Sequence, residues 1–199
     1  MRRCSRGNKI TMKWLQDRFS MVLCALLIGT SISGPTWADA SLSAPPAPRG
    51  ILSIAAYPAP PLVLNDIDGN RFSLVKQKGR WVFVHFWASW CGPCRREMPA
   101  IQQMVEKLKT LPLAFAIVNT AENEDAVFTF LGLLAPDIVP LMDLDGMVTE
   151  AWKPRGLPST YLVDPAGVVR YQVLGGRPWD EDEYLRFLTA LSAQSVQQN

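Results

Sequence analysis

The sequence predicts an α/β protein in which a central mixed β-sheet is flanked by helices. Three observations support this fold class. Residues 81–88 (WVFVHFWA) are apolar almost throughout and rich in β-branched and aromatic residues, which is typical of a strand buried on both faces. Helix-like and strand-like segments then alternate as far as residue 163. A hairpin pattern and a last helix follow, and this order favours one mixed sheet.

Two short strands around a turn are expected before the central strand. Residues 61–64 (PLVL) and 71–74 (RFSL) lie on either side of Asn65-Asp66 and Gly69-Asn70, which favour a turn. The segment therefore predicts an N-terminal β-hairpin.

An amphipathic helix is expected soon after the central strand. Apolar residues recur there at spacings of three and four, with charged residues between them, at Met98, Ile101, Met104, Val105 and Leu108. Such a stripe packs against a sheet.

The second half of the chain continues the alternation. We expect a strand at 113–118, a helix at 122–134, a strand at 139–142 and a short helix at 146–152. Residues 159–163 and 168–174 flank the turn sequence Asp164-Pro165-Ala166-Gly167 and predict a second hairpin, and residues 180–191 predict the last helix.

The first 40 residues predict an export signal. A basic stretch precedes the apolar run 21–28, and Ala38-Asp39-Ala40 forms an A-x-A cleavage site, so we expect cleavage after Ala40. An uncleaved membrane anchor is the alternative, although the apolar run is shorter than the roughly 20 residues of a spanning helix. Residues 41–61 are rich in Ala and Pro and predict an extended linker, with the folded domain over 62–199.

The basic residues concentrate in the predicted signal. Residues 1–40 hold six of the 20 basic and two of the 18 acidic residues, which leaves 14 basic and 16 acidic residues in the rest of the chain. The mature protein would therefore carry a net charge of −2, which offers no charge argument for binding nucleic acid.

Removal of the signal also removes two of the four cysteines, Cys4 and Cys24. Cys91 and Cys94 would remain, in the motif Cys91-Gly92-Pro93-Cys94, which follows a buried strand and opens a helix. Unpaired N–H groups at a helix start stabilise a thiolate, so the pKa of Cys91 should fall from about 8.5 towards about 7. Cys91 would attack a substrate disulfide and Cys94 would resolve the mixed disulfide. Zinc binding is the weaker alternative, because zinc takes four ligands.

The residues around this motif resemble a known family. Residues 86–94 (FWASWCGPC) resemble the thioredoxin active site, and residues 95–99 (RREMP) and 156–164 (GLPSTYLVD) resemble more narrowly the exported TlpA/ResA-like, DsbE-type branch of that superfamily. The resemblance covers about residues 62–191. It implies a thioredoxin fold with an N-terminal β-hairpin extension and an inserted helix, and a thiol-disulfide oxidoreductase that needs no cofactor or metal.

The resemblance also implies residues that contact the substrate. Pro158 matches the family's cis-proline, which presents the preceding backbone for strand-like pairing, so Leu157 and Pro158 are expected substrate contacts. Trp90 would line the rim of the site, and Gly92 would let a partner approach closely. Pro93, which suits the first helical turn, is a further expected substrate contact.

Two residues carry hypotheses about proton transfer. Glu97 lies one helical turn after Cys94, and similar proteins carry an acid there. It either tunes the ionisation of the thiols or relays a proton to or from Cys94, or it is a solvated acid of the first turn. His85, the only histidine, replaces a buried aspartate of thioredoxin. It is either a neutral core histidine or a proton carrier for Cys94.

Thioredoxin has the same Gly-Pro pair between its cysteines and a reduction potential of about −270 mV, whereas the oxidant DsbA has a reduction potential of about −120 mV. The Gly-Pro pair therefore favours a reductase. The resemblance implies a periplasmic location, a membrane thiol donor of the DsbD/CcdA kind, and disulfide substrates such as apocytochrome c or a copper-site protein. A dithiol oxidase or isomerase is one alternative. A copper-binding assembly protein is another, although no histidine follows Cys94.

Overall fold

The computed structural model describes residues 46–195. The strands are β1 (Ile51–Pro58), β2 (Val63–Asn65), β3 (Arg71–Ser73), β4 (Trp81–Trp87), β5 (Leu113–Thr120), β6 (Leu141–Asp143), β7 (Ser159–Val163) and β8 (Val168–Leu174). The helices are α1 (Gly92–Leu108), α2 (Glu124–Leu134), α3 (Met147–Trp152) and α4 (Asp182–Ser195), with a 3-10 turn at Leu74–Gln77. The predicted signal and its cleavage site lie outside the described residues.

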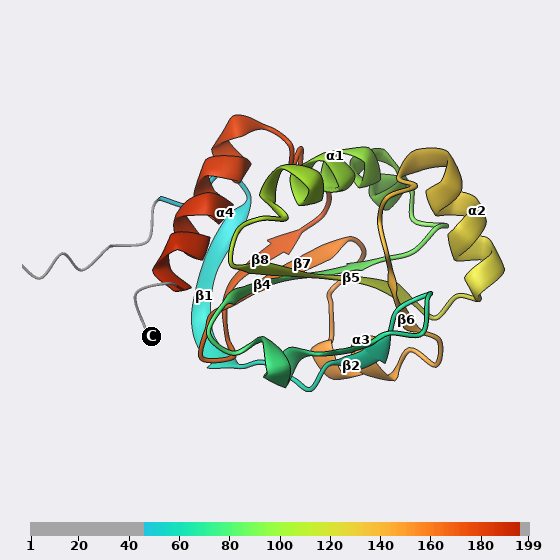
Figure 1. Ribbon diagram of the computed structural model, residues 1–199, viewed down its shortest axis with the longest axis horizontal. Coiled ribbons are helices and arrows are strands. Elements are labelled where there is room, and N and C mark those ends of the chain that lie inside the picture. The colour runs from blue at the N-terminus through green and yellow to red at the C-terminus, as the bar shows by residue number, and fades with distance from the viewer. Residues whose placement is uncertain (1–45, 196–199) are drawn as a thin grey trace, which may run out of the picture. The chain divides into compact units, whose positions relative to one another are not determined.

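A six-stranded mixed sheet, in the order β1-β8-β7-β4-β5-β6, forms the centre (Figure 1). Its middle strand β4 pairs parallel with β5, where Val84 lies beside Ala116, and antiparallel with β7, where Val84 lies beside Tyr161. All seven residues of β4 are buried, as the apolar segment predicted. The carboxyl end of β4 leads into the cysteine motif.

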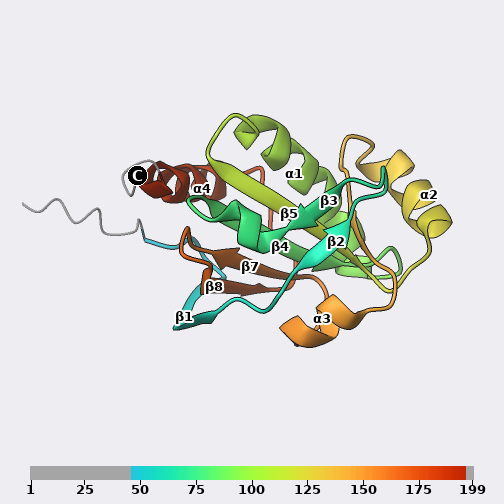
Figure 2. The same ribbon diagram turned by 60° about the horizontal axis from the view of Figure 1, so that its bottom comes forward.

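Side chains alternate between the two faces of β4, and each face has its own apolar core. Trp81, Phe83 and Trp87 belong to the core beneath α1, α2 and α4. Val82 and Phe86 belong to the opposite core, which the hairpin and α3 cover. Figure 1 shows α1 and α4 on one side of the sheet, and Figure 2 brings the β2–β3 hairpin and α3 forward on the other.

The expected linker over residues 41–61 is wrong for residues 51–58. These residues form β1, which pairs antiparallel with β8, Ile51 lying beside Val173. Ile51 is buried in the core. Two residues before it, the carbonyl of Arg49 accepts a hydrogen bond from the hydroxyl of Tyr184 on α4 at 3.0 Å. An edge strand exposes most of its side chains, so its sequence does not need the alternation that marks a strand with a buried face. The folded part therefore begins before the expected start at Leu62.

The other elements lie within a few residues of their predicted bounds. The expected N-terminal hairpin is confirmed, since Leu64 of β2 pairs with Phe72 of β3. Helix α4 continues past its expected end at Leu191, because the hydroxyl of the buried Ser195 accepts a hydrogen bond from the backbone N–H of Trp81 at 3.3 Å. No helix within residues 46–195 is both long and apolar enough to cross a membrane.

Candidate active site

A disulfide between Cys91 and Cys94 lies at the start of α1. Cys91 is the N-cap residue of the helix, and its sulfur accepts a hydrogen bond from the backbone N–H of Cys94 at 3.2 Å. A sulfur at this position lies at the positive end of the helix dipole, which favours a thiolate once the bond is reduced. Cys91 is 4% exposed and Cys94 is fully buried, so Cys91 is the more accessible of the two sulfurs.

An aromatic layer supports the disulfide from inside the molecule. Trp87, the last residue of β4, is fully buried in the core that contains both cysteines. Its ring lies 5.1 Å from that of Phe130 on α2, measured between ring centroids. The guanidinium carbon of Arg95 on α1 lies 5.2 Å from the centroid of the same Phe130 ring. Packing of this kind fixes the position of the motif on the sheet.

Three of the predicted contact residues lie at the surface beside the cysteines, whereas Leu157 is half-buried and Pro158 is buried. Trp90 is 69% exposed, and Gly92 and Pro93 are exposed beside it. The peptide bond between Leu157 and Pro158 is cis, as the resemblance implied. Ser159, which follows Pro158, pairs with Phe86, so this bond lies beside the end of β4 that leads to Cys91. The roles of these residues in binding substrate stay predictions.

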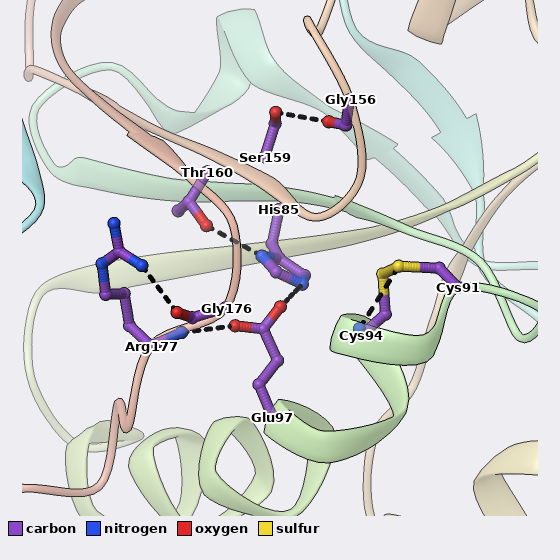
Figure 3. Close-up of polar contacts among 9 residues, drawn as sticks. All are labelled: His85, Cys91, Cys94, Glu97, Gly156, Ser159, Thr160, Gly176 and Arg177. Carbon is purple, nitrogen blue, oxygen red and sulfur yellow. Dashed lines mark hydrogen bonds and ion pairs between the residues drawn. A yellow bond between two sulfur atoms is a disulfide. The ribbon is translucent and has the colours of Figure 1, made fainter.

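Glu97 is buried on the inner face of α1, one turn after Cys94. Only 5% of the residue is exposed, so the alternative of a solvated acid is wrong. One carboxylate oxygen, Oε2, accepts a hydrogen bond from the backbone N–H of Arg177 at 2.9 Å. The other, Oε1, lies 3.3 Å from Nε2 of His85 (Figure 3). A Cβ atom at Gly176 would lie 3.3 Å from Oε2, so a glycine there lets the loop approach the carboxylate closely.

His85 is fully buried on β4 and contacts polar groups on two other elements. Its Nδ1 lies 2.8 Å from the hydroxyl of Thr160 on β7. Its Nε2 faces Glu97 at ion-pair distance but outside hydrogen-bond alignment. The structure therefore brings together the two residues that carried separate hypotheses about proton transfer.

Sequence reasoning missed Glu122, which holds the loop before Cys91. Its Oε2 accepts hydrogen bonds from the backbone N–H of Ser89 and from Nδ2 of the buried Asn119, each at 2.7 Å. Its Oε1 accepts from the hydroxyl of Ser89 at 2.5 Å. Glu122 and Ser89 are far apart in the sequence, and no local pattern marks the pair. In residues 46–195 no three His, Cys, Asp or Glu side chains form a group that could hold a metal ion.

Residues 54–188 match the family model described as Redoxin. The chain belongs to the Redoxin family. This redoxin is 34% identical over 117 residues to the thiol-disulfide oxidoreductase ResA of Bacillus subtilis, an alignment that covers 59% of this chain and 65% of that relative. The chain thus spans just under two thirds of the length of that relative.

Two solved structures are similar to this redoxin. One is a proposed thiol:disulfide interchange protein DsbE from Chlorobium tepidum, with 30% identity and a TM-score of 0.61, covering 70% of this chain and 99% of that one. The other is the thioredoxin domain of a thiol-disulfide oxidoreductase from Bacteroides vulgatus, with 26% identity, a TM-score of 0.59 and the same coverage. The predicted thioredoxin-like fold with an added N-terminal hairpin is confirmed.

Proposed function

We propose that this thiol-disulfide oxidoreductase of the ResA/DsbE type acts outside the cytoplasm as a reductase of specific protein disulfides. The observation that carries the proposal is the Cys91–Cys94 disulfide at the start of α1, with Cys91 at the surface side and Cys94 fully buried. This arrangement gives the two sulfurs different tasks, because only Cys91 is placed to meet a second protein.

The reduced protein would begin the reaction with the thiolate of Cys91. It attacks one sulfur of the substrate disulfide, and the other substrate sulfur leaves as a thiolate that takes a proton from solvent. Cys94 then loses its proton and attacks Cys91, which forms the Cys91–Cys94 bond and releases the second substrate thiolate. Two electrons pass to the substrate, and Glu97, one turn from Cys94, is the group proposed to accept the proton.

The direction of electron flow rests on the two residues between the cysteines. A Gly-Pro pair accompanies potentials of about −270 mV in thioredoxin, well below the value of about −180 mV of protein disulfide isomerase. Equilibration of this protein with glutathione should give a potential on the reducing side of that value. A potential above about −180 mV would instead identify a dithiol oxidase or isomerase.

Export and partners complete the proposal. Residues 1–40 support a periplasmic location, with the protein either released after Ala40 or tethered by an uncleaved signal. A reductase in an oxidising compartment needs a supply of electrons, which a membrane thiol donor of the DsbD/CcdA kind would provide. The proposed substrates are disulfides of apocytochrome c or of a copper-site protein.

Trapping the mixed disulfide tests the proposal. A Cys94→Ser variant, expressed as the full chain with its signal, should accumulate a disulfide between Cys91 and its substrate, because the resolving thiol is missing. The matched control is Cys91→Ser, which keeps the fully buried thiol of Cys94 and removes the slightly more accessible thiol of Cys91. Non-reducing electrophoresis and mass spectrometry identify the partner. Equal recovery of partners from the two variants would overturn the assignment of Cys91 as the attacking residue.

A further inference from the structure

The polar contacts of His85 suggest a role beyond filling the core. The imidazole is fully buried, Nδ1 lies 2.8 Å from Oγ1 of Thr160, and Nε2 lies 3.3 Å from Oε1 of Glu97. Within residues 46–195, neither Nε2 nor Oε1 has a hydrogen-bond partner. The one polar contact that these two buried atoms make within the described residues is therefore the 3.3 Å approach to each other.

A hydrogen atom must lie on one of these two atoms. Two buried lone pairs that face each other at 3.3 Å repel, and the desolvation of both atoms would remain uncompensated. A neutral imidazole carries one hydrogen, on either nitrogen, and a carboxylate carries none. The pair can therefore hold its hydrogen in more than one way.

Thr160 allows the pair to change its proton content without moving any heavy atom. When the hydroxyl donates to Nδ1, the ring hydrogen lies on Nε2 and faces a charged Glu97. When the hydroxyl accepts from Nδ1, Nε2 can accept a hydrogen from a protonated Glu97, or can keep its own as part of an imidazolium. The second arrangement contains one proton more than the first. A hydroxyl rotates freely enough to serve both, because its hydrogen is not fixed by the heavy atoms.

The surroundings give this proton a source and an exit. Cys94 lies three residues before Glu97 on α1, so the two side chains share one helix face. On the other side of Glu97, a cleft of about 330 Å³ is lined by Pro93, Arg96, Glu97, Ala100, Gly176, Arg177 and Pro178.

Two charged side chains line the cleft beside the pair within the described residues. They are Arg96 on α1 and Arg177 in the loop after β8, and the guanidinium of Arg177 is bound to the carbonyls of Gly176 and Leu174. Strand β5 places Ile117 beside His85 and strand β7 places Thr160 there, so neither presents a charge at that position.

We propose that His85, oriented by Thr160, enables Glu97 to accept the proton of Cys94 when the mixed disulfide is resolved. His85 is thus a positioning residue that acts through Glu97, and the proposal rests on the proposed function. In this step the Cys94 thiol gives its proton to the Glu97–His85 pair, and its sulfur bonds to Cys91. The bond between Cys91 and the substrate sulfur breaks, the substrate thiolate leaves, and the pair later releases its proton through the cleft.

Stopped-flow kinetics with a symmetrical nitrobenzoate disulfide, whose thiolate absorbs visible light, separate the two steps. The first equivalent of coloured thiolate reports the attack of Cys91, and the second reports resolution by Cys94. His85→Asn keeps an amide close to the position of Nδ1, where it can still pair with Thr160, but the amide cannot take up a proton. The variant should slow the second phase about tenfold and leave the first within about twofold, since a positioned acid–base group contributes about 10²–10⁴-fold. The second phase of this variant should also rise more steeply with pH, because solvent base must remove the proton.

A matched pair at position 160 separates this role from packing. Thr160→Val removes the hydroxyl and should slow the second phase, whereas Thr160→Ser retains it and should react like the wild type. An unchanged second phase and pH profile in His85→Asn would overturn the proposal, and so would an equal slowing of both phases. A wild-type protein that shows neither phase would refute the proposed function instead.

Discussion

Replacing Glu122 with glutamine should lower the free energy of unfolding of the oxidised protein by about 1–2 kcal/mol. The carboxylate accepts three hydrogen bonds, two from Ser89 and one from Asn119. Glutamine can keep all three contacts as neutral hydrogen bonds, with its oxygen facing the two N–H donors and its amide facing the Ser89 hydroxyl. The change therefore removes only the assistance of the charge, which is about 1 kcal/mol for each bond before solvent screening. Glu122 is partly exposed, so the total is reduced.

Alanine at the same position should have a larger effect. It removes both acceptor oxygens and all three hydrogen bonds, and it leaves Nδ2 of the buried Asn119 without a partner, which costs about 1–3 kcal/mol in addition to the lost bonds. We expect a total loss of about 3–4 kcal/mol. Guanidinium unfolding of the oxidised protein measures both values, and Glu150→Gln, the same change at an exposed carboxylate, should stay within about 0.5 kcal/mol of the wild type. If Glu122→Gln matched Glu150→Gln and Glu122→Ala lost less than about 1 kcal/mol, the three bonds would not stabilise the loop.

Three further predictions follow from burial. Trp87→Ala should lower the free energy of unfolding, measured in urea, by about 3–5 kcal/mol. Trp90→Ala, at a residue 69% exposed, should leave that free energy near the wild-type value and slow only the reaction with protein disulfides. Equal destabilisation by the two changes would contradict the assigned burial. A chain that begins at Leu62 should unfold at a lower urea concentration than one that begins at Pro46, because it lacks β1. The burial of Ile51 by itself contributes about 1.5–3 kcal/mol. Equal midpoints would refute a stabilising role for β1. Burial raises the pKa of all four tyrosines, so absorbance titration should show their phenols ionising at higher pH in the folded protein than in the urea-unfolded protein. The stability that this shift contributes is complete below the unfolded pKa of about 10 and is lost as the pH rises through the folded pKa. Superimposable titrations of the two states would contradict the prediction.

The buried strand and the cysteine motif were predictable because their signals are local. Residues 81–88 are apolar on both faces, and Cys91-Gly92-Pro93-Cys94 combines a spacing with a strand before it and a helix after it. The helix and hairpin bounds followed from apolar spacing and turn residues. These features depend on residues that are close together in the sequence, so the sequence shows them directly.

Features that depend on distant contacts were not predictable in the same way. Residues 51–58 pair along one edge only, and the prolines on either side of them are equally typical of a spacer. The burial of Glu97 depends on the loop at Gly176 and Arg177, and the pairing of Glu122 with Ser89 joins two separate loops. A charged residue is usually exposed, so only the fold itself could indicate that these two carboxylates accept hydrogen bonds from distant parts of the chain.

The pairing of β1 with β8 has a consequence for biogenesis. Among the described residues, the first strand to leave a ribosome or a translocation pore bonds to the last strand of the sheet, since Ile51 lies beside Val173. The edge of the domain therefore stays open until residues 168–174 have emerged, and closing it requires two segments far apart in the sequence to come together. During that interval β1, which has no charged residue, presents a free backbone edge that a chaperone could cover.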